Sequence, residues 1–107
     1  MSTGKIANLE KLLGTPRDGA LLRYGLGTEH EKAGDAARAI EHLRKAVEFD
    51  AGYSAAWSLL GKLLAEAGRK DEAGEAWARG IEAARKRGDK QAEKMMTVFM
   101  KRLAKNP

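Results

Sequence analysis

The sequence predicts an all-α fold built from antiparallel helix-turn-helix units. Three observations support this prediction: alanine is abundant while β-branched residues are scarce, apolar residues recur at helical spacing, and the chain matches itself after a shift of 34 residues. The alternation of apolar and polar residues that marks an exposed strand is missing. At 107 residues, the chain has the length of one domain with a modest core.

Six helical segments are expected: residues 5–13, 19–33, 36–49, 54–67, 70–87 and about 89–105. The first is a short segment with Ile6, Leu9 and Leu13 on one face, and Pro16 ends it within the stretch "GTPRDG". It is too short to be stable alone, so it either packs on the following helix or is mobile. The second segment follows this break directly.

The later segments have equally local signals. The segment 36–49 carries a clean apolar stripe that includes Ala36, Ile40 and Leu43. The "DAGY" connection at 50–53 separates it from the segment 54–67. Gly88 stands where a helix C-terminus favours a left-handed residue, so the segment 70–87 ends there and a last helix follows.

The internal repeat has a period of 34 residues, with one helix-turn-helix in each copy. The shift pairs identical residues: Leu26 with Leu60, Gly27 with Gly61, Ala33-Gly34 with Ala67-Gly68, Ala39 with Ala73, Glu41 with Glu75, and Glu48 with Glu82. Gly34 and Gly68 mark the turn within each copy, whereas the earlier glycine of each copy falls in mid-helix.

A mid-helix glycine costs roughly 1 kcal/mol relative to alanine, so Gly27 and Gly61 need a reason. The absence of a side chain lets a second helix approach closely. We expect each glycine to face the alanine of its own unit, Ala39 or Ala73, with the larger Leu43 or Trp77 filling the space beside it. A larger side chain at Gly61 should then overpack the unit by roughly 1–3 kcal/mol or more.

The segment 46–84 resembles a tetratricopeptide repeat. The family's pattern maps onto Trp57, Leu60, Gly61, Leu64, Ala73, Trp77 and Gly80, and the preceding copy matches it at Leu26, Gly27, Gly34, Ala39, Leu43 and Ala46. Three departures stand out: Arg23 occupies the tryptophan position, His30 an aromatic position, and Arg85 the closing proline position. The resemblance covers about residues 20–87.

The resemblance implies a right-handed superhelix of antiparallel helix pairs within one domain, 1–107. Its expected parts are an N-terminal helix and linker (1–19), a first repeat (20–53), a second repeat (54–87) and a C-terminal capping helix (88–107). Two repeats are few for a stable repeat domain, so the flanking helices are expected to act as caps.

Composition excludes several classes of protein. There is no cysteine, hence no disulfide and no thiolate site. No apolar run is long enough for a membrane span, and the first residues lack the core of a signal peptide, which predicts a soluble cytoplasmic protein. The net charge of +5 is confined to the last quarter of the chain, either as a solvated surface or as a site for an acidic partner.

No catalytic, cofactor or metal motif is found, so we expect no enzyme, no cofactor and no metal site. The two histidines, His30 and His42, lie on different helices, and His30 is expected in or near the core. The stretch "GLGTEH" lacks the third glycine and the preceding strand of a dinucleotide fingerprint.

Protein binding is the leading hypothesis, because the resemblance implies a concave groove lined by the first helix of each repeat. The expected groove residues are Leu21, Tyr24, Thr28 and Glu31, followed by Ala55, Ser58, Lys62 and Ala65. The family's clamp for chaperone-tail carboxylates is not expected, since Tyr24, Thr28, Leu59, Asp89 and Glu93 occupy its positions. The partner is therefore a protein or peptide of another kind.

Two alternatives remain open. The last helix has an apolar face, which is either a cap or a docking or homodimer surface, and its candidate residues are Met95, Met96, Phe99 and Met100. The basic C-terminal region could instead bind nucleic acid or another polyanion. Nucleic acid is the less favoured partner, because no aromatic platform is interleaved with these charges.

Overall fold

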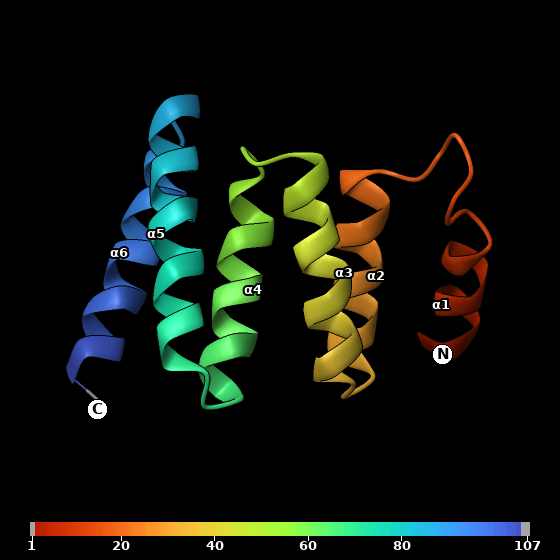
Figure 1. Ribbon diagram of the computed structural model, residues 1–107, viewed down its shortest axis with the longest axis horizontal. Helices are drawn as coiled ribbons and strands as arrows, with labels where there is room; N and C mark the ends of the chain where they lie inside the picture. The colour runs from red at the N-terminus through yellow and green to blue at the C-terminus, as the bar shows by residue number, and fades with distance from the viewer. Residues whose placement is uncertain (1, 106–107) are drawn as a thin grey trace. The chain divides into compact units, whose positions relative to one another are not determined.

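The computed structural model describes residues 2–105, and every regular element within that range is an α-helix (Figure 1). The helices are α1 (Ser2–Glu10), α2 (Ala20–Lys32), α3 (Ala36–Phe49), α4 (Ser54–Glu66), α5 (Lys70–Arg87) and α6 (Lys90–Lys105). The predicted all-α fold is confirmed. The helix boundaries agree closely with the sequence-based ones everywhere except in α1.

Helix α1 begins and ends earlier than the predicted segment 5–13. After Glu10 the chain tightens into turns, in which the N–H of Leu12 donates to the Leu9 carbonyl at 3.0 Å and that of Leu13 to the Glu10 carbonyl at 3.1 Å. Gly14 then takes a φ of +75°. The break therefore precedes Pro16, because the chain reverses through Gly14 before it reaches the proline.

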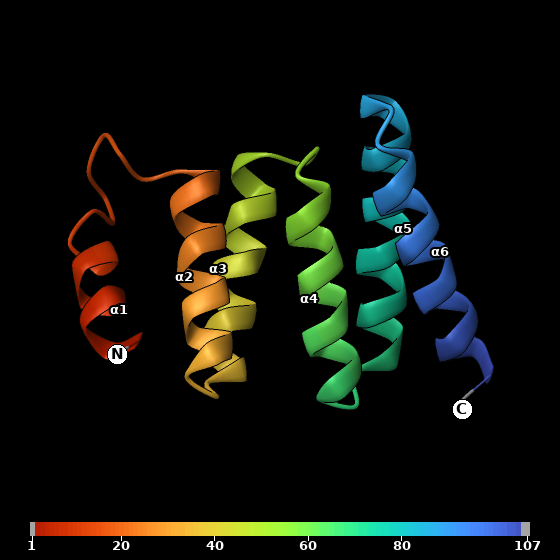
Figure 2. The same ribbon diagram turned by 180° about the vertical axis from the view of Figure 1, so that it is seen from behind.

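The chain forms two compact units, one running through Asp50 and the other beginning at Ala51. The first unit contains α1, α2 and α3, with α2 in contact with both of the others (Figure 2). Its core is apolar apart from Glu29 and a polar cluster described below. The buried apolar residues are Leu22, Leu26, Ala39, Ile40, Leu43, Ala46 and Val47. Helix α1 packs on α2, where Lys5 forms an ion pair with the buried Glu29 at 3.5 Å.

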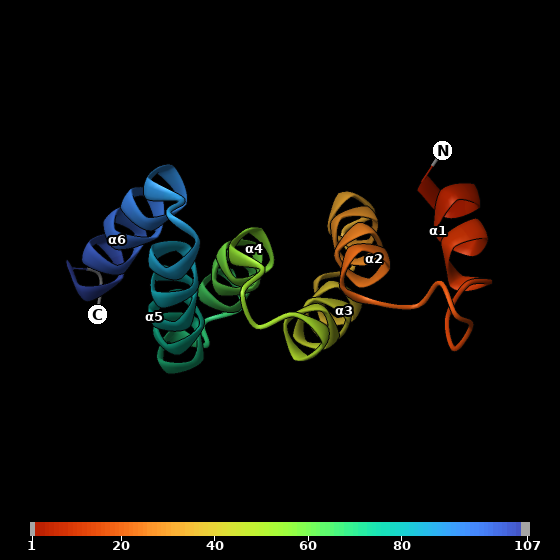
Figure 3. The same ribbon diagram turned by 90° about the horizontal axis from the view of Figure 1, so that it is seen from above.

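The second unit contains α4, α5 and α6, with α5 between the other two (Figure 3). Its core is richer in aromatic carbon, and its buried apolar residues are Ala56, Trp57, Leu60, Leu63, Leu64, Ala73, Ala76, Trp77, Ala83, Ala84 and Met96. The turn between α4 and α5 passes through Gly68 at φ +79°, and Gly34 takes the equivalent φ of +80° in the first unit. The period of 34 residues thus produces the same turn twice.

Both mid-helix glycines lie where a side chain has no room. A Cβ at Gly27 would be 2.8 Å from Leu43 Cγ, and one at Gly61 would be 2.5 Å from Trp77 Cδ1. The nearest neighbours are the side chains that were expected beside the glycines, Leu43 and Trp77. The Ala39 carbonyl oxygen is also close to the Gly27 position, at 3.5 Å.

Helix α6 covers α5 and closes the second unit. Met96 is fully buried, and the rings of Trp77 and Phe99 lie 5.3 Å apart between centroids. A Cβ at Gly80 would be 2.7 Å from Trp57 Cβ and would also collide with the Met96 sulfur, so glycine at this position lets three helices meet. The interpretation of the last helix as a cap on α5 agrees with this packing.

Candidate functional site

The predicted groove residues lie on α2 and α4, at the surface of their respective units. Leu21 is 77% exposed, the highest value among the large apolar side chains of the described residues. Tyr24, Thr28 and Glu31 are half-buried along the same helix, and the Thr28 hydroxyl donates to the Gly25 carbonyl at 2.8 Å. On α4, Ala55 and Lys62 are exposed, while Ser58 and Ala65 are half-buried.

The two acidic side chains at the clamp positions have structural partners. Asp89 precedes α6, and its Oδ1 accepts from the N–H of Ala92 at 3.0 Å, as a helix N-cap does. Glu93 accepts from Arg85 Nε at 2.6 Å, which ties α6 to α5. These contacts account for both acids within the second unit. The absence of a chaperone-tail clamp stays a prediction.

The four candidate docking residues of α6 differ in exposure. Met96 is fully buried and Phe99 contacts Trp77, so both contribute to packing within the second unit. Met95 is 44% exposed and Met100 is half-buried. Within the second unit, Met95 thus offers more accessible apolar surface than Met96. The role of this helix in docking or dimerisation stays a prediction.

A polar cluster occupies the first unit, where the family pattern has aromatic residues. The rings of His30 and His42 stack with centroids 5.3 Å apart and planes 8° apart. His30 is buried as expected, and its Nε2 has no hydrogen-bond partner in the structure. Arg23 Nη1 lies 3.4 Å from His42 Nδ1. Two imidazoles and a guanidinium therefore share a partly buried space.

The charges of this cluster shift two pKa values. Arg23 binds Asp18 through two hydrogen bonds of 2.9 and 3.0 Å, and this pairing lowers the pKa of Asp18 to about 2, with help from the N–H of Gly14. Burial lowers the pKa of His42, and the nearby Arg23 and His30 lower it further. At neutral pH the cluster thus combines an ionised Asp18 with an uncharged His42.

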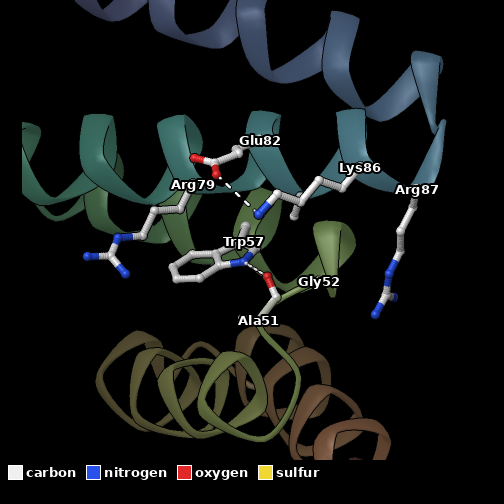
Figure 4. Close-up of a pocket in the computed structure, with 8 residues that line it drawn as sticks. Ala51, Gly52, Trp57, Arg79, Glu82, Lys86 and Arg87 are labelled. Atoms are coloured by element: carbon white, nitrogen blue, oxygen red, sulfur yellow. Dashed lines mark hydrogen bonds and ion pairs between the residues drawn. The ribbon is translucent and has the colours of Figure 1, made fainter.

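The second unit contains a pocket of about 400 Å³ beside Trp57 (Figure 4). One wall is the face of α5 from Arg79 to Arg87, and the other is the Ala51–Gly52 segment. The indole N–H of Trp57 donates to the Ala51 carbonyl at 2.8 Å. The guanidinium of Arg79 lies 5.9 Å from the centre of the indole ring.

The sequence alone did not predict this pocket, because Trp57 was identified only as a position of the repeat pattern and the basic residues only as an excess of charge in the last quarter of the chain. The available signal was the spacing of Arg79, Glu82 and Lys86, which places three charged residues on one face of α5. That Trp57 lies beside this face does not follow from the spacing. It depends on how α4 packs against α5.

Within residues 2–105, no group of three or more histidine, cysteine, aspartate or glutamate side chains could hold a metal ion. None of the helices in this range is both long and apolar enough to cross a membrane.

Comparisons with known proteins agree with the helix pairs. Two family models of the tetratricopeptide repeat match, one over residues 31–97 and one over residues 6–54. The chain is 53% identical over 98 residues to TPR repeat-containing protein PA0015 of Pseudomonas aeruginosa, covering 92% of this chain and 93% of that protein.

Two solved structures support the same assignment. Protein BPP2914 from Bordetella parapertussis is 41% identical with a TM-score of 0.78, and the match covers 94% of this chain and 87% of that one. A tetratricopeptide repeat domain protein from Salinibacter ruber is 30% identical with a TM-score of 0.79, and the match covers 84% of this chain and 100% of that one. Tetratricopeptide repeats generally mediate protein–protein interaction. With the 34-residue period, the paired helices and these matches in agreement, the chain belongs to the tetratricopeptide repeat family.

Proposed function

We propose that this protein is a non-enzymatic scaffold that binds a peptide or protein partner through the concave groove of its repeats. The binding residues are those of the first helices: Leu21, Tyr24, Thr28 and Glu31 on α2, and Ala55, Ser58, Lys62 and Ala65 on α4. The family supports a protein partner, and the mixed character of these side chains suits a peptide with both polar and apolar residues.

The exposure of Leu21 is the observation that carries this proposal. Its side chain is 77% exposed, although a leucine gains about 1.5–3 kcal/mol when it is fully buried. A partner side chain packed against Leu21 would recover part of that free energy. Single exposed leucines are common, but Leu21 lies on the first helix of its repeat, the helix through which this family binds its partners.

The test is quantitative affinity capture from a lysate of the source cell, with a matched pair of variants. Leu21→Asp places a charge on α2, and Phe49→Asp places the same charge on α3, where Phe49 is 55% exposed. The amount of a groove partner that is captured should fall at least ten-fold with Leu21→Asp and should stay unchanged with Phe49→Asp. Circular dichroism melts show whether both variants fold.

A second variant extends the test to α4. Tyr24→Ala combined with Lys62→Glu changes one residue on each first helix and should also release the partner. A partner that survives this variant and Leu21→Asp, or that leaves only with Phe49→Asp, contradicts the groove proposal. Recovery of the protein alone in every sample would instead indicate self-assembly.

A further inference from the structure

The pocket beside Trp57 combines apolar and cationic surface in one place (Figure 4). Trp57 is only 9% exposed, so it contributes a strip of ring carbon to the pocket, without an open stacking face. Its indole N–H already donates to the Ala51 carbonyl. The part of a ligand that lies on Trp57 must therefore be apolar and small, such as an aliphatic side chain.

The charged residues of the pocket favour an anionic ligand. Its lining holds three basic side chains, Arg79, Lys86 and Arg87, and one acidic side chain, Glu82. Arg79 pairs with Glu75 at 3.5 Å and Lys86 with Glu82 at 3.3 Å, and the side chains of both basic residues remain more than half exposed. Exposed pairs of this kind contribute about 0–1 kcal/mol, so a ligand carboxylate can compete for either cation.

The loop side of the pocket brings a third cation close. A Cβ at Gly52 would be 2.5 Å from Arg87 Nη2, so the glycine leaves the space that this guanidinium occupies beside the Ala51–Gly52 segment. In Figure 4 the side chain of Arg87 extends past Gly52, on the side of Trp57 opposite Arg79. Positive charge therefore stands at both ends of the indole.

The order of charges along α5 separates two kinds of anion. Arg79, Glu82 and Lys86 succeed one another as plus, minus and plus on one helix face. A nucleic acid carries an unbroken series of phosphates, and one of them would face Glu82. A short peptide with two carboxylates around an apolar side chain matches this pattern. Its uncharged apolar residue would lie beside Glu82, where a second negative charge would be repelled.

We propose that the α5 face of the second unit is a second binding site, which takes a short acidic peptide with an apolar residue between its carboxylates. The apolar side chain packs on Trp57, one carboxylate binds Arg79, and the other binds Lys86 with Arg87 nearby at the opposite end of the ring. This site combines the Arg79–Arg87 face of α5 with Trp57 of α4 and the Ala51–Gly52 segment before α4, and it shares no residue with the proposed groove.

A random heptapeptide library displayed on phage tests this site with the full chain. Peptides are selected on the wild type and counter-selected on the double variant Arg79→Gln, Lys86→Gln. The surviving peptides should carry aspartate or glutamate on both sides of an apolar residue and bind the wild type at least ten-fold better than the variant. The matched control, Lys94→Gln with Lys101→Gln, removes the same charge from exposed positions of α6 and should bind like the wild type.

The indole N–H resonances then locate the bound peptide, because the chain has two tryptophans. Addition of a selected peptide should shift the Trp57 signal more than the Trp77 signal, and Leu21→Asp should leave that shift unchanged. Survivors without acidic residues, equal weakening by the control variant, or no Trp57 shift would each overturn the site. Displacement of the peptide by an equimolar single-stranded oligonucleotide would reassign it to nucleic acid.

Discussion

The helix pairs α2–α3 and α4–α5 perform the same structural task with different chemistry. In the second unit, the indole N–H of Trp57 donates to the carbonyl of Ala51 in the preceding connection. In the first unit, Arg23 stands at the equivalent position and binds the carboxylate of Asp18 in its own preceding connection. Both contacts fasten a first helix to the segment before it, one through a neutral hydrogen bond and the other through an ion pair.

The contrast continues at the interface of each pair. His30 and His42 stack in the first unit, and the residues 34 positions later are Leu64 and Ala76, both buried. The repeat geometry therefore accepts a stacked imidazole pair or an aliphatic pair at the same place. The difference teaches that the helix pairing does not require aromatic residues at these positions, whereas the sensitivity of each unit to pH depends on which residues occupy them.

The largest effect is expected at the glycines, where the two units differ in what fills the space. Gly61→Ala should destabilise the protein by about 1–3 kcal/mol, because the rigid Trp77 ring cannot yield to a new methyl group. Gly27→Ala should cost less, since the flexible Leu43 can change rotamer. Chemical denaturation of both variants measures the difference.

Gly74→Ala is the matched control, because its Cβ would meet Leu103 Cδ2 at an ordinary 3.6 Å. It should stabilise the protein by up to about 1 kcal/mol through helix propensity alone. Equal destabilisation by all three alanines would show that close approach is not what distinguishes Gly27 and Gly61.

A smaller effect is expected from the histidines. The pKa of His42 is lowered by burial and by Arg23 and His30, while Glu41 and Glu10 oppose the shift. The unfolded chain therefore binds more protons than the folded one between the folded pKa and 6.5, so the stability of the first unit should fall as pH drops below about 6.5. Protection factors from amide hydrogen exchange at α2 and α4 measure the two units separately.

The double variant His30→Leu, His42→Ala gives the first unit the residues of the second. Its α2 amides should lose this pH dependence, whereas α4 should show little of it in either protein. A wild type whose α2 protection is constant from pH 8 to pH 5 would contradict the account.

The smallest effect is expected from Asp18. Arg23 holds the pKa of this carboxyl at about 2, below its usual 3.8, so the contribution of the pair is present above pH 3.8 and is lost as pH falls toward 2. Asp18→Asn should lower the melting temperature slightly at pH 7 and less so in high salt. Glu66→Gln, which removes a charge from an exposed position of α4, is the control. A larger loss in the control would refute a specific role for the pair.

Much of the fold could be predicted because its signals are local. The turns at Gly34 and Gly68 and the apolar stripe of α3 are visible in short stretches of sequence. The repeat then supported the assignments of α2 to α5 a second time. The predicted end of α1 was less accurate. The prediction relied on Pro16 as the break, whereas the chain already reverses through Gly14, and that turn depends on backbone geometry.

The surface features were harder to predict, because they depend on side-chain packing between helices. The family pattern leads to an aromatic residue at position 30, but nothing in it indicates that His30 would stack on His42. In the same way, Trp57 fits the pattern of a core residue, and only the packed helices show a strip of its ring beside the cations of α5. Spacing along one helix cannot reveal a neighbour on another.

Both tryptophans of the chain, Trp57 and Trp77, lie in the second unit, and both indole N–H groups donate to backbone carbonyls, those of Ala51 and Ser58. Intrinsic fluorescence excited at the red edge of the absorption band therefore reports on only half of the molecule. An unfolding curve recorded this way would miss early melting of the first unit. Its coincidence with a curve from far-ultraviolet circular dichroism would show that the two halves unfold together.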